Sequence, residues 1–375
     1  MRRRLTTATI CLLLHVCASV ASAQILTGAI KPNTKPVSVI PKAATQSLPS
    51  QRTYSWPKTV GTRPTVGHPK VINVAPERQP PALPQTANNL AAVPARAGAA
   101  AGEVQFGPRG EPLLWRVKSA TATVYLLGSV HIGDKRIFPL DPRVDDAFHA
   151  SDTVAFETEI TPIAKAEIQR LLDLYGTYPA GQSLDQHLEP GLIGKLDALL
   201  ERHHLARGRM HRLRPWCAAL ALSTIAYREA GFSPDYGIEE HLRRQATRKK
   251  VDHIETIAQQ TDVFRLMPEA AQVDALRTTI EQFGELAPEL GRALDAWRAG
   301  DLQRLATAIL DPLRKTSPEF YASLVTARNK TMAAAVEQYL QNQGTMFVVV
   351  GSGHLIGAGS VLELLAERGH PAERI

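Results

Sequence analysis

Short apolar runs lie near both ends of residues 105–375, and longer stretches with a helical apolar period lie between them. Short, largely continuous apolar runs are typical of strands in the interior of a sheet. The strands expected on this basis cover residues 113–117, 121–128 and 346–351. Residues 153–160 alternate instead, which predicts a strand with Ala155, Glu157 and Glu159 on one face.

The stretches between these runs have the features of helices. Thr161 and Pro162 form an N-cap and first-turn pair, and residues 215–230 are apolar on most sides, as in a buried helix. The expected helices cover residues 141–149, 161–176, 215–230, 238–250, 269–286, 318–343 and 360–368. Strands from both ends with helices between them predict one α/β domain over residues 105–375, whose first and last strands come from distant parts of the chain.

The N-terminus resembles a secretory signal. Three arginines precede the apolar residues 8–20, and Ala21, Ser22 and Ala23 provide small side chains for cleavage. We therefore expect residues 1–23 to be removed and the protein to be periplasmic or secreted. No later segment approaches about 18 consecutive apolar residues, so no transmembrane anchor is expected after cleavage. A lipid anchor at Cys17 is the competing interpretation, which the preceding Val16 disfavours.

Residues 24–104 are rich in Pro and Ala and have no sustained apolar period, which predicts a disordered tether. The chain has a net charge of +7. The signal carries three arginines and the tether carries nine basic residues against two glutamates, so residues 105–375 are mildly acidic. The high isoelectric point therefore gives no reason to expect nucleic-acid binding. The tether could make weak contact with anionic envelope surfaces.

One short sequence motif, Gly-Ser-x-His, occurs twice. Gly128-Ser-Val-His131 and Gly351-Ser-Gly-His354 each follow an apolar run, and glycine at that point permits a tight turn. Ligands of open α/β sheets bind beyond the carboxyl ends of the strands. If the two strands are close in the sheet, His131 and His354 face each other there.

Glu157 is the third candidate, because a carboxylate within a strand flanked by Val, Ala and Phe is costly unless a charge or metal meets it. Two imidazoles and one carboxylate can bind a metal and leave positions open for water and substrate. The alternative is two hydrogen-bonded histidines and a Glu157 paired with an arginine. The residues alone leave the two interpretations equally weighted.

At these residues the sequence resembles the TraB/GumN family, which is similar to Tiki metalloproteases and more distantly to erythromycin-esterase-like and ChaN-like proteins. The match rests on the two Gly-x-x-His motifs, Glu157 and the segments around Glu239, Glu255, Trp297 and Arg328. The resemblance implies a mixed central sheet surrounded by helices and a site for a divalent ion such as Mn²⁺, Co²⁺ or Zn²⁺. It also implies a peptide or other cell-envelope substrate, and links to polysaccharide export or signalling.

Further candidates flank this set. The resemblance places Arg328 and Asn329 near the site, where Arg328 could orient a substrate carboxylate or neutralise Glu157. Glu239 and His241 are two residues apart, so at most one of them can face the metal. Glu159 is a speculative general base.

Other polar residues have simpler explanations beside the functional one. Asp134 could orient His131 or cap the next turn. His211 lies among arginines and is expected on a solvated basic surface. Ser129 and Ser352 are candidate nucleophiles, although neither lies in a G-x-S-x-G elbow.

Three hypotheses follow. The first is an exported, divalent-metal-dependent hydrolase with His131, Glu157 and His354 as ligands. The second is a metal-free, esterase-like hydrolase in which a histidine and Glu157 act as acid and base. The third is a non-catalytic envelope factor that binds a ligand such as haem or a peptide signal.

Overall fold

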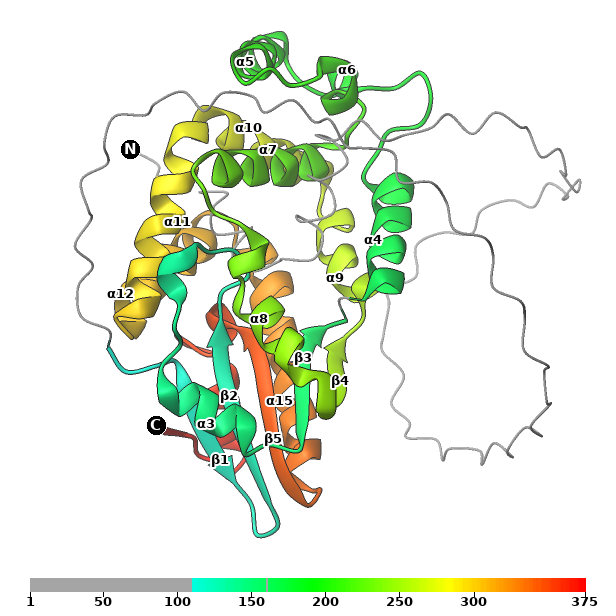
Figure 1. Ribbon diagram of the computed structural model, residues 1–375. Coiled ribbons are helices and arrows are strands. Elements are labelled where there is room, and N and C mark those ends of the chain that lie inside the picture. Colours follow the sequence, from blue (N-terminus) through cyan, green and yellow to red (C-terminus); the bar gives the residue numbers. More distant parts are fainter. Residues whose placement is uncertain (1–109, 160) are drawn as a thin grey trace, which may run out of the picture. The chain divides into compact units, whose positions relative to one another are not determined.

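A computed structural model describes residues 110–159 and 161–375, which form a mixed six-stranded sheet covered by helices (Figure 1). The α/β fold with a mixed central sheet is therefore confirmed. Along the sheet the strands are β4 (Lys250–Glu255), β3 (Thr153–Thr158), β5 (Gly344–Gly351), β2 (Ala122–Ser129), β1 (Leu114–Lys118) and β6 (Glu373–Arg374). The signal and tether expected over residues 1–104 lie outside the described residues. In the described part, no helix has both the length and the apolar character that a membrane span needs.

The four strands β2, β5, β3 and β4 are parallel, whereas β1 is antiparallel to β2 and β6 is antiparallel to β1. The central strand β5 is apolar throughout its buried part, with Phe347, Val348 and Val349 fully buried, as expected for a strand covered on both faces. Because β2 and β5 are neighbours in register, Ser129 lies opposite Gly351. The two Gly-Ser-x-His motifs therefore lie side by side at the ends of β2 and β5.

Helices cover both faces of the sheet and also lie beyond the carboxyl ends of its parallel strands (Figure 1). Helix α15 packs against β2 and β4, and α7 packs against α10 and α11. The helices are α3 (Pro142–His149), α4 (Pro162–Tyr175), α5 (Pro190–Arg202), α6 (Arg207–Met210), α7 (Pro215–Glu229), α8 (Ile238–Gln245), α9 (Ile257–Arg265), α10 (Glu269–Glu281), α11 (Phe283–Arg298), α12 (Leu302–Ile309), α13 (Asp311–Thr316), α14 (Pro318–Tyr321), α15 (Ala327–Leu340) and α16 (Val361–Glu367).

Three of the expected helices differ from those observed. The helix expected over residues 238–250 ends at Gln245, and the chain then enters β4, a strand that the sequence pattern did not predict. The helix expected over residues 269–286 breaks at Gln282, whose backbone leaves the helical region. The helix expected over residues 318–343 contains a π-helical segment, Ala322–Thr326, immediately before α15.

Candidate functional site

The ends of β2, β3 and β5 bring three predicted site residues together. His131, Glu157 and His354 are buried, with 4%, 3% and 0% of their surfaces exposed. A Cβ atom added to Gly351 would lie 3.2 Å from His131 Nε2, 3.5 Å from Glu157 Oε2 and 3.6 Å from His354 Cδ2. The three side chains therefore surround Gly351, and the missing side chain of this glycine keeps the space between them open.

Glu157 is an ionised, buried carboxylate. Its Oε1 accepts hydrogen bonds from Arg328 and from Gln260 Nε2, the latter at 2.9 Å, and its Oε2 accepts the Gly351 N–H at 3.0 Å. Burial alone would raise the pKa of Glu157, but the Arg328 charge, assisted by both histidines and the Gly351 N–H, lowers it to about 2. The carboxylate is therefore charged at neutral pH.

Arg328 holds two carboxylates at once. Its Nη2 bonds to Glu157 and, at 2.7 Å, to Glu255 Oε2, and its Nε lies 2.9 Å from Glu255 Oε1. Of the two roles considered for Arg328, the structure shows the neutralisation of Glu157. Because all three side chains are at most 6% exposed, this ion pair is little screened by water.

His354 is held as a neutral ring with one bare nitrogen. Its Nδ1 lies 2.6 Å from Asn329 Oδ1, and Asn329 Nδ2 donates to Gly359 O at 2.7 Å, which fixes the amide oxygen toward the ring. Burial and the nearby Arg328 charge lower the pKa of His354 to about 3. Nε2 is buried and has no hydrogen-bond partner among the described residues, so its lone pair is available to a ligand.

His131 is held by a carboxylate instead. Its Nδ1 lies 2.7 Å from Glu239 Oε1, which also accepts the Ser129 hydroxyl. Burial lowers the pKa of His131, but the charge and hydrogen bond of Glu239, together with Glu157, raise it above its usual value. Glu239 thus fixes the Nδ1 side of the ring, and Nε2 lies on the side toward Gly351.

The start of α8 fixes Glu239 beside this histidine. The N–H of Ile238 donates to Val130 O at 3.0 Å, and a Cβ on Gly237 would lie only 2.4 Å from His131 O. The backbone of α8 can approach the histidine turn this closely because residue 237 has no side chain.

The donor atoms suit a divalent cation in kind and in charge. Glu157, Glu239 and Glu255 are buried; Arg328 pairs with Glu157 and Glu255, and Glu239 pairs with His131. The formal charge of the cluster is −2 with both imidazoles neutral and −1 with His131 protonated. A buried charge of this size is costly unless a cation balances it. As the side chains lie, however, no three His, Cys, Asp or Glu groups in the described residues stand at metal-ligand spacing.

Several other candidates lie away from this cluster. Glu159 is exposed and accepts the Thr161 hydroxyl at 2.8 Å. Asp134 accepts the Arg136 N–H at 2.9 Å and caps a short helical turn, which is the simpler of its two expected roles. His241 packs its ring on Phe138, with ring centroids 4.5 Å apart.

The two serines have structural partners. Ser129 donates its hydroxyl to Glu239, and Ser352 donates to Ser129 O at 2.6 Å. Neither hydroxyl is bonded to a histidine base, so the arrangement gives no support to a serine nucleophile.

The expectation of a solvated surface was wrong for His211. The ring is 3% exposed and lies between Asp185 and Asp197, with nitrogen–oxygen distances of 3.0 and 2.8 Å. Arg207 pairs with both aspartates. The cluster links α5, α6 and the turn before α5, and it is a structural ion-pair network.

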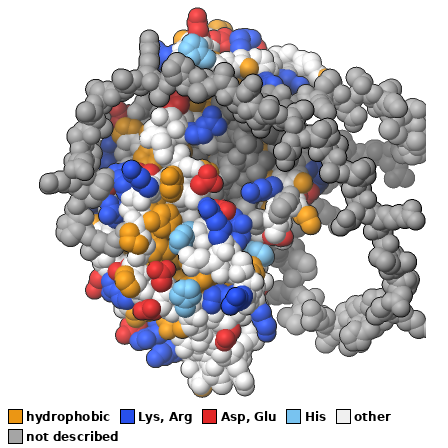
Figure 2. All heavy atoms as spheres, viewed as in Figure 1, with side chains coloured by type: hydrophobic (Ala, Val, Ile, Leu, Met, Phe, Trp, Pro, Cys, Tyr) orange, Lys and Arg blue, Asp and Glu red, His pale blue; other side chains and the backbone are white. Residues whose placement is uncertain are grey.

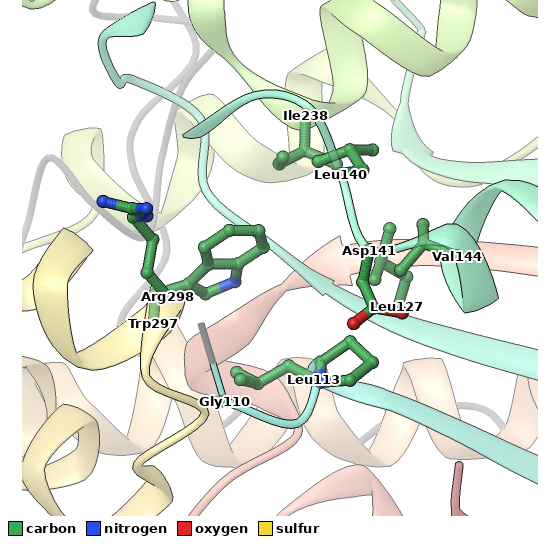
Figure 3. A pocket seen from close by; sticks show the side chains of 10 residues that line it. Gly110, Leu113, Leu127, Leu140, Asp141, Val144, Ile238, Trp297 and Arg298 are labelled. Atoms are coloured by element: carbon green, nitrogen blue, oxygen red, sulfur yellow. The ribbon is translucent and has the colours of Figure 1, made fainter. Parts of the chain in front are cut away.

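A small apolar cavity lies behind the first histidine turn (Figure 3). Trp297 donates its indole N–H to Gly128 O at 2.8 Å, and Leu113, Leu127 and Ile238 line the space beside it. Its volume of about 20 Å³ is enough for one water molecule, so it supports the turn and is no substrate pocket.

Glu255 and Gln260 were not predicted as site residues. Glu255 ends the edge strand β4, and Gln260 lies on α9 just after the Thr256 capping box. The sequence signal that could have identified Glu255 is a second carboxylate at the end of a strand, but β4 itself was not recognised.

Comparisons with known proteins agree with the resemblance seen in the sequence. The model of the TraB/PrgY/gumN family matches residues 113–374. The chain is 24% identical to Metalloprotease TIKI1 of Danio rerio and 22% identical to the Metalloprotease TIKI homolog of Amphimedon queenslandica, over 69% and 70% of this chain. It is 20% identical to an uncharacterized protein of Treponema pallidum (strain Nichols), over 69% of this chain and 81% of that protein.

The matches to the two Tiki proteins cover 62% and 61% of those proteins, so the chain spans about three fifths of their length. No solved structure matches the chain.

Proposed function

The chain belongs to the TraB/PrgY/gumN family, and from that premise we propose that residues 105–375 are a divalent-metal-dependent hydrolase that cleaves peptide bonds in the cell envelope. His131, Glu157 and His354 would hold the ion. The supporting observation is that these three side chains surround the Cα of Gly351 while His354 Nε2 is buried and has no hydrogen-bond partner among the described residues.

The remaining residues of the cluster would orient these three. Asn329 would keep the proton of His354 on Nδ1, and Glu239 would do the same for His131, so that each ring is held by its Nδ1 side. Arg328 and Gln260 fix the Glu157 carboxylate. A bound ion would supply Lewis acidity toward a scissile carbonyl and toward a water molecule.

The peptide substrate is inferred from the relatives named metalloproteases. Export is inferred from the features of residues 1–23 in the sequence. Because His354 is completely buried, a substrate can reach the site only after neighbouring side chains move.

The test uses the protein from residue 24 onward. Bound metal is measured by elemental analysis, and cleavage of a peptide library is measured with and without a chelator. His354→Ala removes the bare nitrogen, and Gly351→Ala fills the shared space while its backbone, at φ −53° and ψ 135°, accepts alanine. His370→Ala, at a partly exposed histidine outside the cluster, is the matched control.

We expect about one metal ion per chain and cleavage that the chelator abolishes. His354→Ala and Gly351→Ala should lose both, whereas His370→Ala should keep them. Chelator-resistant cleavage would instead indicate a metal-free hydrolase, and metal binding without turnover a non-catalytic envelope factor. A protein with neither metal nor turnover would refute the proposal.

A further inference from the structure

A second pocket, separate from the cluster around Gly351, opens between α3 and α8. Each helix contributes two side chains spaced four residues apart, Asp145 and His149 from α3 and His241 and Gln245 from α8. Phe138 and Leu140 supply the apolar part of the wall. The open volume is about 650 Å³, in the usual range for ligand sites. Figure 2 shows histidine side chains on this face, over α3 and α8.

Asp145 forms no ion pair with a lysine or arginine in residues 110–159 and 161–375, although its charge acts on the neighbouring His241. Two nearby acids are paired, since Asp141 binds Arg143 and Glu240 binds both Arg243 and Arg244. No lysine or arginine lines the pocket. The carboxylate of Asp145 is therefore available to a cation from outside.

The His241 imidazole supplies no opposing charge. Gln245 Nε2 lies 2.7 Å from His241 Nε2, and because the amide nitrogen can only donate, this ring nitrogen accepts. Burial, assisted by the Arg244 charge, lowers the pKa of His241 against the opposing charge of Asp145, which keeps this ring neutral at neutral pH. The exposed His149 is the other titratable group in the wall.

Alternative ligands suit the pocket less well. Among the described residues, no three His, Cys, Asp or Glu side chains stand at metal-ligand spacing, so the two histidines and Asp145 do not form a metal site. An anion would meet the Asp145 carboxylate and no lysine or arginine. An alkyl chain that ends in a cation could lie on Phe138 and Leu140 and place its charge at Asp145.

We propose that the pocket between α3 and α8 binds an aliphatic cation, the ammonium or guanidinium group of a lysine- or arginine-like side chain. Asp145 would form a charge-assisted hydrogen bond with the head group, and the Phe138 ring would pack against the stem. This site is independent of hydrolysis at the cluster around Gly351, although residues 131–138 connect the two places along the chain.

The probes are agmatine for the guanidinium group and Nα-acetyl-lysine amide for the ammonium group. Nα-acetyl-norleucine amide is the neutral control of similar length. Binding is followed by the ring NMR signals of His149 and His241, assigned with His149→Gln and His241→Gln, and by calorimetry. Comparison of the two cations shows which head group is preferred.

Asp145→Asn should weaken binding of the preferred cation by about ten-fold or more, as loss of a charge-assisted hydrogen bond requires. Phe138→Leu should weaken it by about two- to five-fold. Asp146→Asn removes the same charge from an exposed position of α3 and should leave binding unchanged. Thermal unfolding of each variant verifies that the fold is intact.

Three results would overturn the proposal. They are norleucine amide binding as tightly as the cations, Asp145→Asn and Asp146→Asn weakening binding equally, and no saturable binding of either cation. Because none of these measurements uses peptide cleavage, a failed hydrolase proposal would leave this test valid.

Discussion

At the scale of single residues, the stability of the cluster depends on the charge of Glu157. The carboxylate has a pKa of about 2 in the folded protein, against an ordinary value of 4.5. A carboxyl group whose pKa is depressed by folding stabilises the folded state above its unfolded pKa, and this stabilisation is lost as the pH falls through the folded value. The difference corresponds to about 3 kcal/mol.

Glu157→Gln should therefore unfold more easily than the wild type at neutral pH and lose less stability in acid. The gap between the two unfolding free energies should shrink by about 3 kcal/mol between about pH 5 and pH 2. Urea unfolding with a chelator present measures this gap. Glu285→Gln, at an exposed glutamate on α11, is the control. A gap that stays constant with pH would contradict the ion-pair account.

Asn329 provides a second test at this scale. Leucine at this position has a similar volume but cannot accept a hydrogen bond from His354 Nδ1–H or donate one to Gly359 O. Loss of such a partner to a metal-ligating histidine lowers metal affinity by about 10- to 100-fold. Competition with a metal-sensitive dye should show this loss for Asn329→Leu and none for Asn342→Leu at the surface. Equal affinities in two folded variants would exclude the orienting role.

Some residues of the cluster could be selected from the sequence and others could not. His131, His354 and Glu157 each follow or lie within an apolar strand. A polar side chain is unusual there, so the sequence pattern alone indicated these three as candidates. Gln260 is one of several polar residues on an amphipathic helix, and only the fold shows that its amide reaches Glu157. Of Glu239 and His241 the sequence indicated that at most one faces the site, and the structure shows Glu239 bonded to His131 and His241 packed on Phe138.

At the scale of elements, the start of α8 should be sensitive to a small change that reaches the cluster. A Cβ on Gly237 would meet His131 O at 2.4 Å and Pro234 O at 2.9 Å, both backbone atoms that cannot rotate away. Gly237→Ala should therefore shift the start of α8, move Glu239 from His131 and cost about 1–3 kcal/mol of stability.

The control for this variant is Gly194→Ala. Gly194 lies inside α5 with open space around its Cα, so alanine should raise stability by about 0.5–1 kcal/mol through helix propensity. Urea unfolding measures the change in unfolding free energy of each variant, which should be negative for Gly237→Ala and positive for Gly194→Ala. The His131 ring NMR signal should change only in Gly237→Ala, where Glu239 moves away from His131. A Gly237→Ala protein with wild-type stability and an unchanged His131 signal would show that the start of α8 does not hold Glu239 beside His131.

The elements that the sequence predicted best are those buried on both sides. The strands β2 and β5 and the helix α7 carry mostly apolar residues. Their burial in the folded protein therefore agrees with what the local sequence pattern predicts. The edge strand β4 begins with Lys250, Val251 and Asp252, all exposed, so it has neither an apolar run nor a clear alternation. Its strand conformation comes from pairing with β3, a neighbour almost a hundred residues away that local pattern cannot reveal.

At the scale of the whole molecule, the cluster depends on contacts between distant parts of residues 110–375. Gly351 ends β5, Glu157 lies on β3 and His131 follows β2, so these three strands must pair before the cluster exists. The C-terminal strand β6 pairs with β1, and Arg374 bonds to Glu111 O and Gly300 O. Both ends of the folded unit are therefore tied to the same edge of the sheet.

A chain of residues 105–375 should accordingly fold without residues 1–104, because the six strands, the helices that cover them and the ion pairs of Arg328 with Glu157 and Glu255 are all formed by residues 110–375. We expect the same thermal midpoint and the same far-ultraviolet circular dichroism per folded residue as in the chain that begins at residue 24. A chain of residues 105–371 is the contrasting variant, since it lacks β6 and the Arg374 bonds and should unfold at a lower temperature. If residues 105–375 failed to fold while the longer chain folded, the N-terminal segment would be part of the domain, and the boundary inferred from its composition would be wrong.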